Sequence, residues 1–193
     1  MEQEVARASR KPRSDSLRNR DRLILAAREV FGEGGSGASL EAVARRAGVG
    51  IGTLYRHFPT RDALFQAVYR REIDELVALA ERLSAGPDPV EALRLWLHAN
   101  IGVVATKRGM LAALTPSPSG TSELFADSRT RIFGAVTGLM RRARSEGGLR
   151  SDIGGDDVLR ALYGICYAQE GADWQASATR LIDVLIAGLA ARG

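Results

Sequence analysis

The sequence has 193 residues, of which 45% are hydrophobic and 26% charged, and a net charge of +4. This composition is typical of a globular chain with one domain of usual size or two small ones, and it excludes disordered and fibrous proteins. No apolar run approaches the roughly 20 residues that a membrane-spanning helix needs. The first residues carry charges without a following apolar core, so we predict no secretory signal and a cytoplasmic location.

Basic residues are concentrated in the first third of the chain. Residues 1–71 contain 14 Lys or Arg and 8 Asp or Glu, whereas the remaining residues contain 13 and 15. This asymmetry predicts that the N-terminal part contacts a polyanion and that the rest has a different role. The single cysteine, Cys166, and the two histidines form no set with metal-ligand spacing, so we predict no metal site and no cofactor.

Helical periodicity recurs along the basic third, and no strand pattern does. The spacing predicts an amphipathic helix over 16–32, a short helix that begins after Ser39 and ends at Gly48, and a second short helix over 53–58. Pro59 ends that helix, and a longer one follows over 61–83.

Glycine- and proline-rich breaks divide the remainder into further helices. Apolar periodicity predicts them over 90–107, 122–145, 156–168 and 174–192. We therefore predict an all-α protein of about nine helices.

Residues 39–58 form the pattern of a helix-turn-helix, in which a second helix enters the major groove of DNA. Gly48 permits the conformation that the turn requires, and Leu54 and Phe58, four residues apart, are expected to face inward. A phosphate-binding loop is excluded, because no strand precedes these glycines and no Gly-Lys-Ser/Thr follows. The residues that then face outward offer hydroxyl, phenol, imidazole and guanidinium groups, which bind phosphates and base edges.

The stretch RLILAAREVFGEGG…ASLEAVARRAGVGIGTLYRHFPTRDAL resembles the N-terminal DNA-binding domain of the tetracycline-repressor (TetR) family of bacterial transcription regulators. The similarity covers about residues 18–74 and is most specific over 48–64. It implies that the threonine, tyrosine and histidine of the TLYRHF motif contact operator DNA, and that Arg61, where lysine is usual, contacts phosphate. The predicted DNA-contacting residues are Ser39, Ile51, Thr53, Tyr55, Arg56, His57 and Arg61.

The resemblance also implies a homodimer held by the last two helices and a ligand pocket inside the C-terminal helices. It divides the chain into a basic flexible arm (1–16), a three-helix DNA-binding domain (17–76) and a helical effector-binding and dimerisation domain (77–193). Apolar residues on the last two predicted helices fit a dimer interface, and they are Val158, Leu162, Ile165, Ile182, Leu185, Ile186 and Leu189.

Aromatic, methionine and histidine side chains of the C-terminal part are the candidate pocket residues, although such residues are also common in plain helical cores. They are Trp96, His98, Met110, Phe125, Met140, Tyr163, Tyr167 and Trp174. Few charged residues fall within 95–104 and 162–168, which favours an apolar or aromatic effector.

Taken with the resemblance, these features predict a ligand-responsive transcriptional repressor that binds a palindromic operator as a dimer and is released by a small molecule. The sequence offers no paired carboxylates and no activated nucleophile, so we predict that the protein is not an enzyme. A DNA-binding regulator without an effector, and a helical carrier or enzyme with an accessory basic head, are the alternatives.

Overall fold

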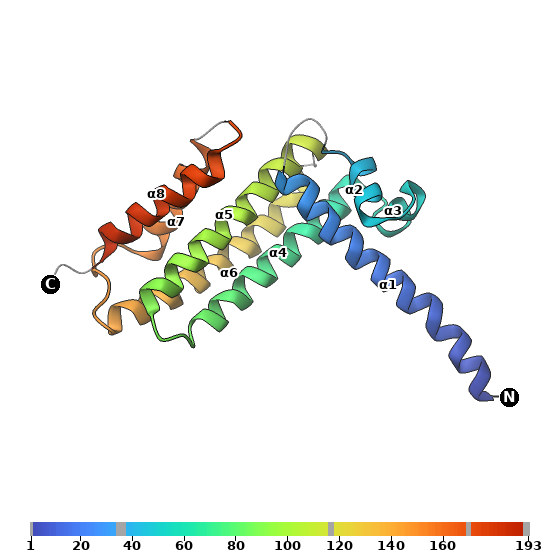
Figure 1. Ribbon diagram of the computed structural model, residues 1–193, viewed down its shortest axis with the longest axis horizontal. Helices are drawn as coiled ribbons and strands as arrows, with labels where there is room; N and C mark the ends of the chain where they lie inside the picture. The colour runs from blue at the N-terminus through green and yellow to red at the C-terminus, as the bar shows by residue number, and fades with distance from the viewer. Residues whose placement is uncertain (1, 34–37, 116–117, 169–170, 191–193) are drawn as a thin grey trace. The chain divides into compact units, whose positions relative to one another are not determined.

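The computed structural model describes residues 2–33, 38–115, 118–168 and 171–190, and within these ranges the chain forms eight α-helices and no β-strand (Figure 1). This confirms the all-α prediction, with eight helices where about nine were expected. The helices are α1 (Glu2–Glu33), α2 (Leu40–Ala47), α3 (Ile51–His57), α4 (Arg61–Leu83), α5 (Pro89–Leu114), α6 (Pro118–Ser145), α7 (Gly155–Tyr167) and α8 (Trp174–Leu189).

The first helix differs most from its expected bounds. It begins at Glu2 rather than near Ser16, so the segment expected to be a flexible arm is helical. Many residues of this segment are good helix formers, and Arg18 donates a hydrogen bond of 2.6 Å to Asp15 one turn away. Hydrophobic periodicity did not predict this part of the helix, because the sequence of residues 2–15 contains no regular apolar stripe.

Helix α5 is also longer than expected, since it continues past residue 107 to Leu114. It passes through Gly109, where an added Cβ would lie only 1.8 Å from the Phe31 carbonyl oxygen of α1. The residues around Gly109 therefore pack directly against the backbone of α1. The hydrophobic periodicity of one segment cannot predict a contact with a helix that is distant in the sequence.

The helices group into two compact units. The first consists of Met1–Val68 together with Thr106–Ser117, and the second of Tyr69–Ala105 and Pro118–Gly193. Helices α4 and α5 each contribute to both units, because each of them crosses the division partway along its length.

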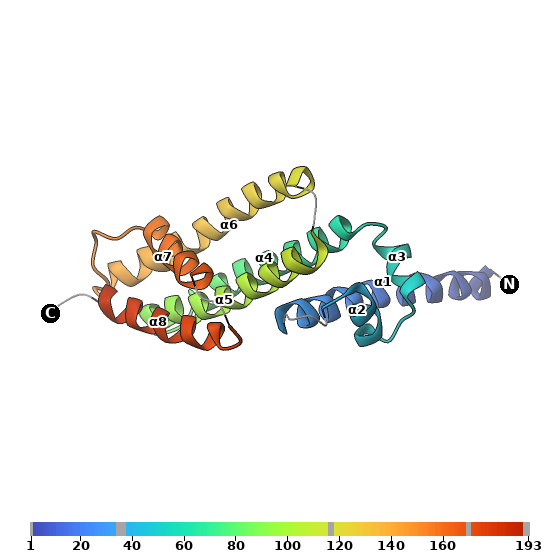
Figure 2. The same cartoon turned by 90° about the horizontal axis from the view of Figure 1, so that it is seen from above.

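In the first unit, α1 packs against α2 and α3 (Figures 1 and 2). Apolar residues three or four apart on α1 bury one face of that helix, as the sequence predicts for 16–32. The most deeply buried side chains of this unit come from all the helices that contribute to it, and they include Leu23, Ala27, Phe31, Val43, Leu54, Phe58, Leu64, Phe65, Val68 and Met110.

In the second unit, α7 packs between α6 and α8 (Figure 2). Trp96 of α5 is fully buried, and its indole Nε1 donates a hydrogen bond of 2.9 Å to the Leu76 carbonyl of α4. Arg142 of α6 donates to the carbonyl oxygens of Ser84 and Gly86, at 2.7 and 2.6 Å, and so ties the α4–α5 loop to α6. These bonds fix α4, α5 and α6 relative to one another inside the unit.

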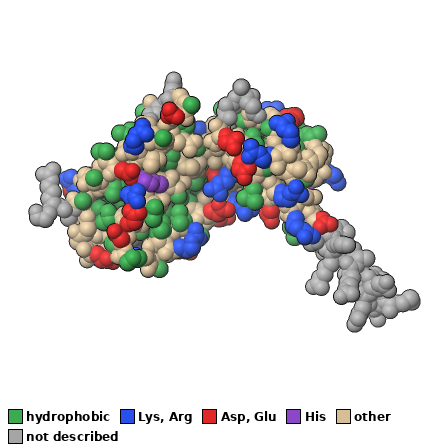
Figure 3. All heavy atoms as spheres, viewed as in Figure 1, with side chains coloured by type: hydrophobic (Ala, Val, Ile, Leu, Met, Phe, Trp, Pro, Cys, Tyr) green, Lys and Arg blue, Asp and Glu red, His purple; other side chains and the backbone are tan. Residues whose placement is uncertain are grey.

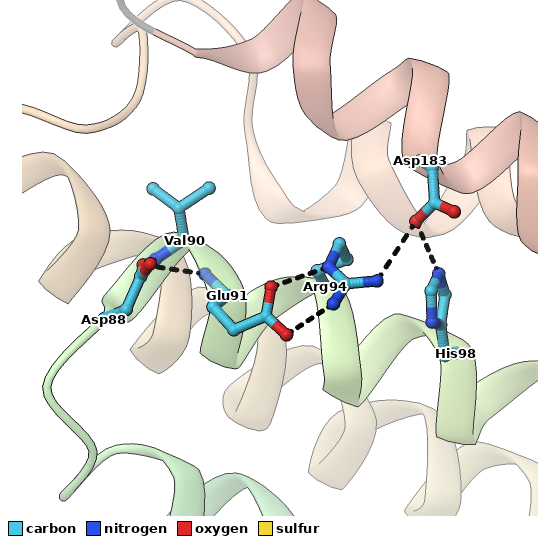
Figure 4. A network of polar contacts seen from close by, with 6 residues as sticks. All are labelled: Asp88, Val90, Glu91, Arg94, His98 and Asp183. Carbon is cyan, nitrogen blue, oxygen red and sulfur yellow. Dashed lines mark hydrogen bonds and ion pairs between the residues drawn. The ribbon is translucent and has the colours of Figure 1, made fainter.

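A polar network joins α5 to α8 (Figure 4). Asp88 accepts hydrogen bonds from the first backbone amides of α5, and Glu91 forms a two-point ion pair with Arg94. One oxygen of Asp183 lies 2.8 Å from Nε2 of His98 and 3.6 Å from Nη1 of Arg94. Hydrogen bonding to Arg94 lowers the pKa of Glu91, which keeps the pair ionised.

Candidate functional site

The turn between α2 and α3 is defined by a capping residue at each end of α2. The Ser39 hydroxyl accepts a hydrogen bond of 3.1 Å from the Ala42 amide, so Ser39 is the N-cap that the sequence predicts. Gly48 has φ of 67° and ψ of 35°, and its amide and that of Val49 bond back to Arg45 and Ala44. This arrangement is a Schellman motif, and it turns the chain sharply into α3.

Two buried side chains hold α3 in the first unit. Leu54 and Phe58 are almost completely inaccessible, as their spacing predicts. The Arg20 guanidinium of α1 lies 4.8 Å from the centre of the Phe58 ring, within the range of a cation–π contact. Helix α3 begins at Ile51, two residues before its expected start, with Gly50 as its N-cap.

The opposite face of α3 is exposed, and it carries unusually large side chains. Tyr55 is 46% exposed and Ile51, one turn earlier, is 38% exposed. Added Cβ atoms at Gly50 and Gly52 would meet nothing within 4 Å, so the surface beside these side chains is open. Tyr55 and Ile51 therefore protrude from the exposed face, beside glycines that have no side chain.

Arg56 and Thr53 are joined to each other. Arg56 Nη2 donates a hydrogen bond of 2.8 Å to Thr53 Oγ1, and its Nε donates a longer one of 3.4 Å to the Gly52 carbonyl. Arg56 is exposed and Thr53 half-buried, so the guanidinium lies along the helix surface. His57 is half-buried, with its ring 6.5 Å from that of Phe58.

Arg61 is exposed at the first residue of α4, directly after the Thr60 N-cap, whose hydroxyl accepts from the Ala63 amide at 3.1 Å. Ser39 is half-buried and its hydroxyl oxygen is occupied by the cap bond. The structure thus brings Ile51, Tyr55 and Arg56 onto the surface of α3 and places Arg61 just beyond its end.

The charges near this surface are partly compensated. Arg46 of α2 lies 2.8 Å from Glu29 and 3.5 Å from Glu33 of α1, and hydrogen bonding to Glu29 raises its pKa. On the face shown in Figure 3, acidic and basic side chains are interspersed and form no single large patch.

The predicted pocket residues divide into several environments. Trp96 and Met140 are core residues of the second unit, and Met110 is buried in the first unit. His98 bonds to Asp183, and Tyr167 is about half exposed. Three of the predicted residues are half-buried in the second unit, namely Phe125, Tyr163 and Trp174.

Sequence reasoning missed a group of buried polar residues in the second unit. Glu72 and Asn100 are 2% and 1% exposed, and Ser128 is buried as well. Tyr69 is buried and stacks edge-on against Phe125, with ring centres 5.4 Å apart. Burial raises the pKa of Tyr69 and of Tyr163, so both remain neutral phenols. The available signal was Asn100 itself, a polar residue within an apolar stretch.

The residues predicted for the dimer interface fall into two environments. Val158, Leu162, Ile182, Ile186 and Leu189 are buried within the single chain. Amphipathic spacing identified an apolar face on each helix, but that face packs inside the unit. Ile165 and Leu185 are half-buried.

A different part of α8 is exposed. We call it the α8 apolar stripe, and it consists of Leu181, Val184, Ala187 and Gly188. Leu181 is 44% and Val184 68% exposed. Hydrophobic side chains are visible at the surface in Figure 3, over the region where α5 and α8 lie in Figure 1.

A chain of helices whose N-terminal unit presents a capped helix-turn-helix has the architecture of a DNA-binding transcriptional regulator. The family model of the tetR family of bacterial regulatory proteins matches residues 23–68, and that of the SbtR-like transcriptional regulator C-terminal domain matches residues 88–191. The chain belongs to the TetR family of transcriptional regulators, and it is not an enzyme.

Solved structures agree with this assignment. The TetR transcriptional regulator SCO0520 of Streptomyces coelicolor is 42% identical, with a TM-score of 0.76 over 90% of this chain and 99% of that one. A TetR regulator of Mycobacterium vanbaalenii is 30% identical, with a TM-score of 0.67 over 92% and 98%. The regulator UidR of Escherichia coli is 28% identical over 77% of this chain and 78% of its own length.

The described residues were also considered for membrane-spanning helices and for metal-binding groups. None of the described helices combines the length and the apolar character needed to cross a membrane. In the same part of the chain, histidine, cysteine and acidic side chains form no group of three or more that could hold a metal ion.

Proposed function

We propose that this protein is a dimeric repressor that binds a palindromic operator through α3 and leaves it when a small molecule binds the C-terminal helices. The observation that carries the proposal is the two-sided character of α3. Leu54 and Phe58 fix the helix in the core, while Tyr55 and Ile51 project from its other face. A helix held in this way can enter a major groove without losing its anchor.

The exposed side chains suit distinct parts of a DNA duplex. Ile51 offers an apolar surface for a thymine methyl group, and Tyr55 offers a phenol for a phosphate. Arg56 is already extended along the helix by its bond to Thr53, and it can exchange that bond for guanine or a phosphate. Arg61 begins α4, where a guanidinium can bind two phosphate oxygens at once. We assign His57 to a phosphate and Ser39 to the edge of the contact.

The dimer that we propose uses the α8 apolar stripe in place of the buried residues first expected. Leu181 and Val184 are exposed large side chains one turn apart, and Ala187 and Gly188 allow close approach of a second helix. Such a dimer is expected to present two copies of α3 to successive major grooves, about 34–36 Å apart. We place the DNA-binding domain at 17–76 and the effector-binding and dimerisation domain at 77–193, in the cytoplasm where the operator lies.

The effector acts through differential binding. A small molecule that binds more tightly to a dimer with wrongly spaced α3 helices lowers operator affinity by that difference in binding free energy. Helices α4 and α5 are suited to carry this change, because each is continuous across the division between the two units.

A gel-shift assay with the upstream intergenic DNA of the gene for this protein tests the proposal. The full chain is expected to bind this DNA more tightly than a scrambled duplex of equal length at the same salt concentration. The comparison must hold salt constant because phosphate contacts alone give strong, salt-dependent binding to any sequence. Equal affinity for both duplexes would contradict a sequence-specific regulator.

A further inference from the structure

Helices α4 and α5 are consecutive and antiparallel, and one hydrogen bond sets their register (Figure 1). Trp96 Nε1 donates to the Leu76 carbonyl at 2.9 Å. One helical turn further along α5 lies Asn100, and one turn back along α4 lies Glu72. The register therefore puts Asn100 and Glu72 at one level of the second unit, where both are almost completely buried.

Asn100 is an anomaly in this interior. Neither its Nδ2 nor its Oδ1 has a hydrogen-bond partner among the described residues, although the side chain is only 1% exposed. A buried amide normally has all its partners, because leaving donor and acceptor unmet costs the free energy of their desolvation. A leucine at this position would avoid that cost, so packing alone does not account for the amide.

Polar groups from other helices lie close to this amide. Burial raises the pKa of Tyr163 of α7, and the nearby Asn100 amide offsets part of this rise. The two groups do not have hydrogen-bond geometry. Tyr69 of α4 interacts with both Glu72 and Tyr163. Tyr163 of α7 is thus a polar neighbour of the Asn100 amide of α5.

We infer that Asn100 binds the effector through a neutral group that presents a hydrogen-bond donor and an acceptor side by side, as a carboxamide does. The inference rests on the proposed function and deepens it, because it adds a polar head to the apolar or aromatic body that the sequence favours. Such a head satisfies Oδ1 and Nδ2 together. A carboxylate offers only acceptors, and a ketone offers no donor.

Three probes of nearly equal shape separate these chemistries: 2-naphthamide, 2-acetylnaphthalene and 2-naphthoate. The ketone replaces the amide NH₂ by a methyl group of similar size, so only the donor is lost. Calorimetric titration of the full chain is expected to show the amide binding at least about 10-fold more tightly than either of the others. Equal binding of the amide and the ketone would overturn the inference, as would the absence of binding by all three.

Two variants assign the preference to Asn100. Asn100→Leu is expected to bind the amide and the ketone equally and to melt at a temperature no lower than wild type, since it removes an unmet buried amide. Thr137→Val is the matched control, because Thr137 Oγ1 of α6 is also buried without a hydrogen-bond partner in the described chain. The control is expected to keep the wild-type preference for the amide.

Persistence of the amide preference in Asn100→Leu would overturn the inference, and so would its loss in Thr137→Val. The outcome is independent of DNA recognition, because both variants without probe are expected to shift the upstream DNA as wild type does. Failure of wild-type chain to prefer that DNA would contradict the proposed function, whereas failure of the probes to discriminate would contradict only the role of Asn100.

Discussion

Helices α3 and α8 both expose large apolar side chains, yet their surroundings differ. On α3, Tyr55 and Ile51 stand among open glycine positions, with Arg56 beside them. On α8, the exposed Leu181 and Val184 continue into Ala187 and Gly188, and this stripe contains no charged residue. The first surface suits a wet, anionic partner and the second a dry, apolar one. Exposure by itself does not identify a partner, and the neighbouring side chains do.

The largest effect is expected from a charge in the α8 apolar stripe. Val184→Glu would place two carboxylates near the two-fold axis of the proposed dimer, and their repulsion and desolvation would separate the subunits. Because a dimer gains affinity from binding two half-sites together, operator affinity is expected to fall more than about 100-fold. Analytical ultracentrifugation should show a folded monomer.

Leu17→Glu is the matched control for this experiment, since Leu17 is a similarly exposed apolar residue in the first unit. Its mass in the same experiment is expected to remain that of a dimer. If the Val184→Glu variant remains a dimer, α8 is not the interface, and the proposed difference between the α3 and α8 surfaces is wrong.

The two faces of α3 provide the next test. Tyr55→Ala is expected to weaken operator binding about 10- to 100-fold and leave the thermal midpoint nearly unchanged, because the exposed phenol contributes to binding and not to the core. Phe58→Ala removes a fully buried ring and is expected to cost about 3–5 kcal/mol of unfolding free energy. Gel shifts and urea unfolding measure the two effects. A large loss of stability in Tyr55→Ala would show that the phenol is structural.

A single added methyl group is expected to have opposite effects on stability at a closely packed glycine of the first unit and at an open glycine of the second. Gly109→Ala would drive a Cβ into the Phe31 carbonyl of α1, and we expect it to destabilise the fold by about 1–3 kcal/mol. At Gly134 of α6 an added Cβ meets nothing within 4 Å, so Gly134→Ala should stabilise the helix by about 0.5–1 kcal/mol. Urea unfolding of both variants gives the comparison, and effects of the same sign would contradict it.

The smallest effect concerns the link between α5 and α8. Asp183→Asn keeps the size of the side chain and weakens its contacts with His98 and Arg94 (Figure 4). The site is partly exposed, so we expect a loss of no more than about 1 kcal/mol in urea unfolding at neutral pH. A loss several times larger would show that this network is a main support of α8.

The caps and the buried anchors of the helix-turn-helix were predictable from the sequence because local rules define them. The cap at Ser39, the left-handed Gly48 and the inward pair Leu54 and Phe58 all depend on positions within twenty residues of chain, and the structure has each of them as predicted. The C-terminal helices were predicted as helices, but the sequence did not predict which of their side chains are exposed. Spacing gave an apolar face on α7 and α8, and it held no information on whether the chain itself or a second chain covers that face.

The sequence by itself determined the all-α fold, the position of the helix-turn-helix and the TetR resemblance, because helix caps, turn glycines and the TLYRHF motif act over short distances. Only the tertiary structure decided that Ile182 and Ile186 face inward while Val184 faces outward, and that Asn100 is buried without a partner. These properties depend on contacts between helices far apart in the chain. The residues that make such contacts are far apart in the sequence, so no short stretch of sequence includes all of them.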